Sequence, residues 1–273
     1  MNVFIVGLGL IGASYAEKLT EKGHQVYGYD IDTISFNKAK DLKIIEKNSQ
    51  LKNISDSDVV IFALYPEATL RFIKQHINLF KPHQTLTDVS GIKGWLLKAI
   101  HEMLPASLSY TSHHPMAGKE TRGIDHKNKD LFKDANFLII SSNRSNKTDI
   151  SRLNTIAIDL EFSRISIVSA EEHDQMIAYT SQLTHLIAAG LIQSHDSTAS
   201  IATGDSFKDL TRIAKINAPL WSELFLKNKP ALIRVLHDFQ NQLTLLESLL
   251  NQEDKEALIN YLNQAKKRRE SYD

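Results

Sequence analysis

The stretch that most constrains this chain of 273 residues is its beginning, NVFIVGLGLIGASYAEKL. A short apolar run leads directly into glycines at positions 7, 9 and 12, and an apolar pattern with helical spacing follows them. The first glycine permits a tight turn, the second lets a phosphate approach the backbone, and the third allows close packing of helix on strand. This order of strand, glycine turn and helix predicts a unit that binds a dinucleotide pyrophosphate at a helix N-terminus.

An acidic residue after the next apolar stretch completes the predicted cofactor site. Asp30 ends QVYGYD, where a carboxylate can accept hydrogen bonds from both hydroxyls of an adenine ribose. A carboxylate there repels a 2′-phosphate, so the sequence favours NAD over NADP, although Lys38 and Lys40 lie a little downstream. The predicted cofactor-binding residues are Gly7, Leu8, Gly9, Leu10, Ile11, Gly12 and Asp30.

Two kinds of pattern divide the chain. Seven short apolar stretches alternate mostly with amphipathic ones up to residue 168: VFIVG, QVYGYD, DVVIFAL, QTLTDVS, LSYTSHH, NFLIISS and SRISIVS. Strands separated by helices imply a parallel sheet covered on both faces. From residue 169 onward the apolar spacing is helical. We therefore predict an α/β fold: an N-terminal Rossmann-type doubly wound parallel sheet over residues 1–168, followed by an all-α domain over residues 169–273.

The predicted helices after residue 168 carry broad apolar stripes, for example in LWSELFLKNKPALIRVLHDFQNQLTLLESLL. A small helical domain would bury such stripes poorly by itself, so we expect pairing with a second copy in a homodimer. The alternative is that the stripes pack only on the first domain.

Composition excludes several classes of function. The 32 basic and 32 acidic residues cancel, and the most basic run, KKRRE, is typical of a solvated tail, so no nucleic-acid partner is expected. The chain has no cysteine, which excludes disulfides and thiolate nucleophiles and suits a cytoplasmic location; no metal site is expected. The apolar start lacks the basic flank of a signal peptide, and no run is long enough to span a membrane.

Segments beyond the glycine turn carry a family resemblance. DVSGIKG and SHHPMAGKE end two predicted strands, while HDQMIAYTSQLTH and GDSFKDLTRIAKINAPLW lie in the helical half. Together they resemble the prephenate/arogenate dehydrogenases of tyrosine biosynthesis, over nearly the whole chain. The resemblance implies a dinucleotide-binding domain followed by a helical dimerisation domain. It also implies that a small molecule, prephenate, and NAD⁺ are converted to 4-hydroxyphenylpyruvate, CO₂ and NADH.

The resemblance assigns two principal residues. His114, in the histidine–proline pair, is expected to accept the proton of the substrate hydroxyl, because a neutral imidazole is a base near neutral pH. Its neighbour His113 competes for this role, but adjacent strand residues point to opposite faces, so only one can meet the substrate. Arg212, in FKDLTRIA, is expected to bind a substrate carboxylate through its planar fork.

The resemblance also implies further residues at the substrate site. Predicted substrate-binding residues are His185, Glu120, Lys208 and Gly91. The family commonly has a serine where this chain has Gly91, so Ser90 is expected to substitute as a catalytic residue, or a water takes its place. Gln182 stands where relatives can carry histidine, and His173 either lines the pocket or caps a helix.

Other functions stay open at this stage. Arogenate differs from prephenate only at its side chain, and no motif in the sequence distinguishes the two substrates. A β-hydroxyacid dehydrogenase would use a lysine in a G-x-x-x-K motif, which Gly204 to Lys208 fits, but SHHPMAG would then be unexplained. A regulatory protein that binds NAD without catalysis would need neither His114 nor Arg212. The sequence shows no appended amino-acid-binding domain, so any inhibition by tyrosine is expected to be competitive with substrate.

Overall fold

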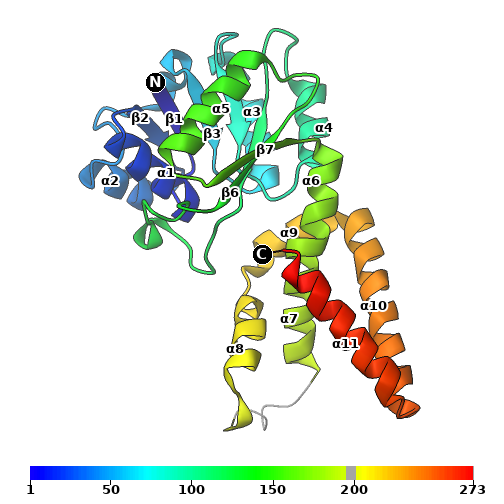
Figure 1. Ribbon diagram of the computed structural model, residues 1–273. Helices are drawn as coiled ribbons and strands as arrows, with labels where there is room; N and C mark the ends of the chain where they lie inside the picture. Colours follow the sequence, from blue (N-terminus) through cyan, green and yellow to red (C-terminus); the bar gives the residue numbers. More distant parts are fainter. Residues whose placement is uncertain (195–200, 273) are drawn as a thin grey trace. The chain divides into compact units, whose positions relative to one another are not determined.

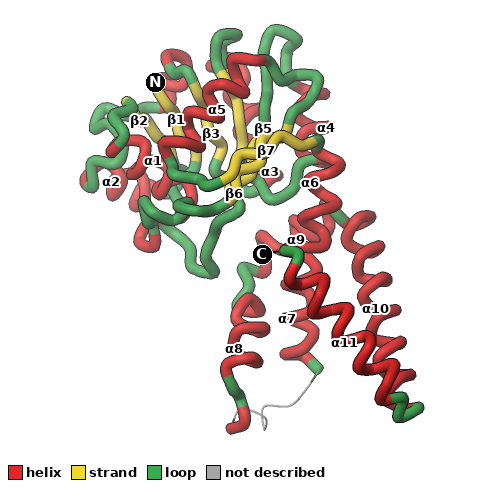
Figure 2. The backbone as a smooth tube through the Cα atoms, viewed as in Figure 1, coloured by secondary structure: helices red, strands yellow, loops and turns green. Residues whose placement is uncertain are grey.

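In the computed structural model, residues 1–194 and 201–272 are described. The chain divides into two compact units, Met1–Asn228 and Lys229–Asp273. The first unit contains all the strands and the helices that accompany them, and the second is a pair of helices (Figures 1 and 2). The helices between residues 169 and 228 belong to the first compact unit together with the strands. The domain boundary at that residue stays a prediction.

Four parallel strands form the first sheet, in the order β2-β1-β3-β4. They are β1 (Asn2–Val6), β2 (Gln25–Tyr29), β3 (Val59–Phe62) and β4 (Thr85–Asp88). In register, Val3 pairs with Val26 on one side and with Val59 on the other, and Val59 pairs with Thr85. The chain runs outward from β1 in one direction to β2 and in the other to β3. Open parallel sheets bind ligands at such a reversal, beyond the carboxyl ends of the strands.

Three further strands extend this arrangement. They are β5 (Ser112–Pro115), β6 (Asn136–Ile140) and β7 (Arg164–Val168), in that order. A parallel bridge between Leu86 and Tyr110 joins β4 to the segment before β5. The seven predicted strands are thereby confirmed, with one difference: β5 and β6 are antiparallel. The link between them carries only the short 3₁₀ helix η3 (Ile124–His126), and an antiparallel pair needs no crossover helix.

Alternate side chains of β1 enter different cores, which explains why helices cover both faces of the sheet. The helices of this part are α1 (Leu10–Glu21), α2 (Thr33–Asp41), α3 (Pro66–His76), α4 (Gly94–Met103) and α5 (Lys147–Asp159), with 3₁₀ turns η1 (Leu51–Asp56) and η2 (Ile77–Leu79). Val3 and Ile5 pack with residues of α1 and α5, whereas Phe4 and Val6 pack with residues of α3 and α4. A strand buried on both faces is apolar along its buried length, as β3 and residues 3–6 of β1 are. The predicted Rossmann-type fold is confirmed.

Helices follow β7 without a further strand in the described residues, as predicted. The first unit continues with α6 (Ala170–Ile177), the π-helical turn η4 (Ala178–Gln182), α7 (Leu183–Gln193), α8 (Asp205–Thr211), the 3₁₀ turn η6 (Arg212–Ala214) and α9 (Ala218–Lys227). Ser169 and Glu172 form a reciprocal capping box that fixes the start of α6. This start matters for the site, because α6 carries side chains that meet the end of β5.

The second unit consists of α10 (Lys229–Asn251) and α11 (Lys255–Glu270). Asp254 caps α11 by accepting a hydrogen bond from the backbone N–H of Ala257. Tyr261 of α11 donates a hydrogen bond to Gln242 of α10, at 3.1 Å, so the two helices contact each other. Across residues 1–194 and 201–272, no helix is both long and apolar enough to cross a lipid bilayer.

Candidate active site

The glycine turn has the conformation that a dinucleotide requires. Gly7 has a φ of +91°, and a Cβ at this position would lie 2.5 Å from the carbonyl oxygen of Ala63. A Cβ on Gly12 would lie 1.9 Å from the carbonyl oxygen of Gly7, so helix and strand approach too closely for any side chain. A Cβ on Gly9 would meet nothing within 4 Å. The first and third glycines are therefore required by packing, whereas Gly9 leaves the backbone open to a ligand.

Two features of this turn suit the two ends of an adenosine diphosphate group. Gly9 caps α1 without any side-chain hydrogen bond, so the first-turn N–H groups stay available to a phosphate. Asp30 accepts hydrogen bonds from the backbone N–H groups of Leu8, at 2.6 Å, and Asp32, at 2.9 Å. These bonds fix its carboxylate beside the turn, and the remaining lone pairs can accept from ribose hydroxyls.

A cavity of about 660 Å³ extends from the glycine turn to the helices after β7. Its volume is within the range of small-molecule sites. Five groups of residues line it: Gly9 to Ile11 from the glycine turn, Ala63 to Pro66 after β3, Val89 to Gly91 after β4, His114 to Gly123 at and after β5, and residues between Ile177 and Leu224 from the helices that follow β7. Of the predicted cofactor residues, Gly9, Leu10 and Ile11 line the cavity, while Gly7, Leu8, Gly12 and Asp30 shape or flank the turn.

The two adjacent histidines of β5 have different surroundings. His113 is fully buried, where its Nε2 lies 3.0 Å from the hydroxyl of Tyr15 and its Nδ1 lies 2.7 Å from that of Thr87. Its ring also stacks on Phe137. His114 is partly buried and lines the cavity. Both nitrogens of His113 are thus engaged in the core, and His114 is the histidine that can meet a substrate.

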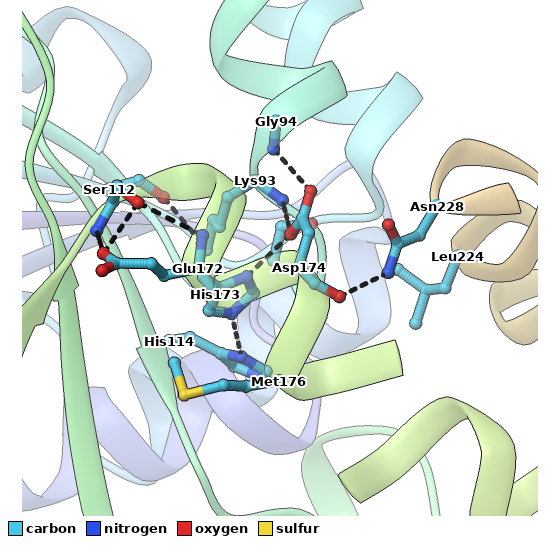
Figure 3. A network of polar contacts seen from close by, with 12 residues as sticks. Lys93, Gly94, Ser112, His114, Glu172, His173, Asp174, Met176, Leu224 and Asn228 are labelled. Carbon is cyan, nitrogen blue, oxygen red and sulfur yellow. Dashed lines mark hydrogen bonds and ion pairs between the residues drawn. The ribbon is translucent and has the colours of Figure 1, made fainter. Parts of the chain in front are cut away.

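His114 is connected to two residues of α6. Its Nδ1 lies 2.8 Å from Nε2 of His173, and Nδ1 of His173 lies 2.7 Å from a carboxylate oxygen of Asp174 (Figure 3). Burial lowers the pKa of His114 well below the ordinary value of 6.5, and the neighbouring His173, Lys93 and His113 lower it further. Burial also lowers the pKa of His173, although the hydrogen bond to Asp174 opposes this effect. Both imidazoles are therefore neutral at neutral pH.

A buried lysine holds the end of β5 against the end of β4. The ammonium group of Lys93 donates to the carboxylate of Asp88 at 2.8 Å, to Oγ of Ser112 at 2.6 Å and to the carbonyl oxygen of His113 at 2.7 Å. Its side chain is 0% exposed. Burial lowers the pKa of Lys93, and the contact with Asp88 opposes that shift. These bonds tie the strand that carries His114 to the segment that carries Ser90 and Gly91.

Arg212, Glu120 and His185 also line the cavity. The guanidinium of Arg212 and the carboxylate of Glu120 form an ion pair. Nδ1 of His185 is 2.8 Å from the carbonyl oxygen of Ser181, and its ring stacks on Trp221 with 3.6 Å between centroids. Arg212 is 62% exposed at its side chain, so it can exchange Glu120 for an incoming carboxylate at little desolvation cost.

The segment after β4 shows why glycine at position 91 matters. A Cβ on Gly91 would lie 3.5 Å from Leu224 and 3.9 Å from Cε1 of His114, so a side chain there would stand beside the histidine. Oγ of Ser90 is buried and has no hydrogen-bond partner among the described residues. Ser90 and Gly91 both line the cavity. Gln182 is also buried. Its amide nitrogen donates to the carbonyl oxygen of Leu224, and its amide oxygen accepts from the side chain of Asn228.

Two predicted roles differ from what the structure shows, and several residues near the cavity were not predicted. Lys208 is an exposed residue of α8 and is not among the residues that line the cavity. His173 does not cap α6, because Ser169 does so. The sequence reasoning missed Lys93, Asp174 and Trp221; only the EEHD segment at a helix start offered a local signal, for Asp174. The π-helical turn η4, which brings Thr180 to Gln182 to the cavity, also had no sequence signal.

Comparison with known proteins agrees with this geometry. Residues 15–161 match the family described as "Prephenate dehydrogenase, nucleotide-binding domain", and residues 169–264 match "Prephenate dehydrogenase, dimerization domain". A prephenate dehydrogenase of Bacillus subtilis is 27% identical over 97% of this chain and 74% of its own length. A cyclohexadienyl dehydrogenase of Zymomonas mobilis is 26% identical over 98% of this chain and 94% of its own.

A solved structure agrees over the whole chain. The prephenate dehydrogenase of A. aeolicus, in complex with hydroxyphenyl propionate and NAD⁺, superposes with a TM-score of 0.89 at 28% identity, covering 100% of this chain and 98% of that one. The two family matches together span most of the 273 residues. The chain belongs to the prephenate dehydrogenase family.

Proposed function

We propose that this protein is an NAD-dependent prephenate dehydrogenase, which forms 4-hydroxyphenylpyruvate, CO₂ and NADH in tyrosine biosynthesis. The observation that carries the proposal is one cavity that joins a dinucleotide-binding turn, a neutral histidine and an arginine. These are the three functions that oxidation of a hydroxylated dicarboxylate requires: a hydride acceptor, a base and an anion site.

His114 has the chemistry of the base. As the hydride leaves the ring carbon, the imidazole accepts the hydroxyl proton, and it can return this proton to the phenolate once the ring is aromatic. The bond to the ring carboxylate breaks in the same process, and its electron pair completes the aromatic ring as CO₂ departs. NAD⁺, when bound, supplies the hydride acceptor. Because burial lowers the pKa of His114, the imidazole keeps its proton-free form at lower pH than a solvated imidazole does.

Arg212 and its surroundings supply the anion site. Its guanidinium can bind a substrate carboxylate with two parallel hydrogen bonds after release from Glu120. The buried hydroxyl of Ser90 has no hydrogen-bond partner in residues 1–194 and 201–272, so a substrate oxygen or a water in the cavity would satisfy it. His185, which lines the same cavity, completes the proposed substrate contacts. Gly91 leaves room beside His114. Lys208 is exposed on α8 outside the lining of the cavity, so the proposed anion site rests on Arg212.

The cofactor preference follows from the acidic turn. Asp30 would repel a 2′-phosphate, and the two lysines downstream are already engaged. Lys38 forms an ion pair with Asp125, and the ammonium of Lys40 lies 3.9 Å from the ring centroid of Phe36. Neither lysine is thus available beside the ribose without breaking a contact, which supports NAD over NADP.

The protein is also proposed to be a cytoplasmic homodimer. The helices of the first unit after β7 expose Leu191, Ile192, Phe207, Leu210 and Leu226, and the second unit exposes Leu243, Leu245, Leu250, Ile259 and Leu262. Exposed apolar side chains in such number are typical of an interface. Light scattering coupled to size exclusion should give about twice the mass of one chain, and a mass of one chain would contradict this part of the proposal.

The deciding experiment is NADH formation, followed at 340 nm with purified protein and NAD⁺. Prephenate and arogenate are tested in parallel, because one relative is a cyclohexadienyl dehydrogenase. NADP⁺ with prephenate is the control for the cofactor. Reduction of NAD⁺ with prephenate is the expected result. Absence of reduction with both substrates, in protein that binds NAD⁺, would refute the proposal.

A further inference from the structure

We propose that His173, held by Asp174, is a positioning residue that fixes the tautomer of His114, so that Nε2 of His114 carries the lone pair facing the cavity. The inference deepens the proposed function and rests on it for the kinetic consequence. The tautomer itself follows from the contacts between two neutral imidazoles and does not depend on the identity of the substrate. The three side chains form one continuous chain of hydrogen bonds, of 2.8 Å and 2.7 Å, from β5 to α6 (Figure 3).

The carboxylate of Asp174 determines which atoms donate and which accept in these hydrogen bonds. One carboxylate oxygen accepts from the backbone N–H of Lys93 at 2.9 Å, and the other accepts from that of Gly94 at 2.8 Å. A backbone N–H can only donate, so the carboxylate acts as acceptor at both oxygens. Its contact with Nδ1 of His173 is therefore a hydrogen bond that Nδ1 donates.

The proton positions of both imidazoles then follow. A neutral imidazole has one N–H, so Nε2 of His173 carries a lone pair. Nδ1 of His114 must donate to that lone pair, which leaves Nε2 of His114 without a proton. Among the residues that the structure describes, no hydrogen bond to this Nε2 is found, and the ring lines the cavity. A base needs an unprotonated nitrogen that faces its substrate, and these two hydrogen bonds leave Nε2 of His114 in that state.

The supporting side chains are anchored on their far side. The backbone carbonyl of Asp174 accepts from the amide of Asn228 at 2.9 Å, and the same amide donates to Gln182 at 2.8 Å. His173 is 0% exposed and cannot turn without displacing its neighbours. The ammonium of Lys93, which lies under β5, disfavours a second proton on the pair of histidines. The tautomer is thus fixed before any substrate arrives, which is preorganisation in the usual sense.

The first measurement needs no substrate. Long-range ¹⁵N–¹H correlation spectra of the full chain, labelled at histidine, distinguish the two neutral tautomers of each ring. His114 is assigned by comparison with the His114→Asn variant. We expect the Nδ1–H tautomer for both His114 and His173 above pH 7. A proton on Nε2 of His114 in the unmodified protein would overturn the inference.

The second measurement uses two substitutions of the same residue. His173→Phe removes the acceptor, so the His114 ring should lose its single tautomer and kcat should fall about 10- to 100-fold, with KM for prephenate within about twofold. His173→Gln places an amide oxygen where Nε2 was, and it should keep the His114 tautomer and much of kcat. His101→Phe is the matched control, because His101 is a histidine of α4 that does not line the cavity.

The outcomes separate this inference from the proposed function. Loss of tautomer and kcat in His173→Phe, with retention in His173→Gln, supports the positioning role. Unchanged tautomer and kcat in His173→Phe would refute it. A chain that shows the expected tautomers but oxidises neither prephenate nor arogenate would refute the proposed function and leave the tautomer assignment supported by the spectra.

Discussion

Replacing the buried Lys93 should show how much the ion pair beneath the site contributes to the stability of the fold. Lys93 donates to Asp88, Ser112 and the carbonyl of His113 within 2.8 Å, with 0% exposure. In Lys93→Met the carboxylate of Asp88 stays buried without its cation. Removing one partner of a buried ion pair costs about 3–5 kcal/mol. At about 2–4 °C per kcal/mol for a chain of this size, the midpoint of thermal unfolding should fall by roughly 10 °C.

Circular dichroism during heating at neutral pH measures this midpoint. Lys22→Met is the matched control, because Lys22 also pairs with a carboxylate, Glu161 at 3.0 Å, but at the surface, and its midpoint should not move measurably. The double variant Asp88→Asn/Lys93→Met removes both charges and should recover much of the loss. A single Lys93→Met variant as stable as the unmodified protein would show that the pair contributes nothing, and would refute the reasoning from burial.

Four further predictions concern the site. His114→Asn should lower kcat by about 10²- to 10⁴-fold with little change in KM, and steady-state kinetics with normal turnover would disprove its role as base. Because burial lowers the pKa of His114, its basic form persists as pH falls, so the acid limb of kcat/KM should lie below pH 6.5; a limb above that value would contradict the burial argument. Arg212→Ala should raise KM for prephenate more than tenfold, and Arg212→Lys should restore it only partly, since one ammonium lacks the fork. Asp30→Ala should raise KM for NAD⁺ by about 10- to 100-fold, as expected for lost hydrogen bonds to a charged group, and an unchanged value would remove Asp30 from the cofactor site.

The sequence by itself determined the elements and the turn that joins the first two. Strand and helix periods are local properties, so all seven strands and the helical half could be predicted. The glycine turn could be predicted because its spacing is a local motif, although the carbonyl oxygen that excludes a Cβ on Gly7 belongs to Ala63, in a distant segment. Alternation along β5 even separated His113 from His114, because neighbours in a strand face opposite sides.

The tertiary structure decided the partners of those residues. His114 meets His173 across 59 residues, and Arg212 meets Glu120 across 92. No local pattern encodes such pairs, because they depend on how the sheet and helices close on each other. The same is true of the buried lysine, which reads as an ordinary surface cation in the sequence. The antiparallel turn of β5 onto β6 was equally invisible, because direction depends on the path of an irregular link. The sequence therefore predicted which residues carry the chemistry, whereas packing decided which partners and which orientation those residues have.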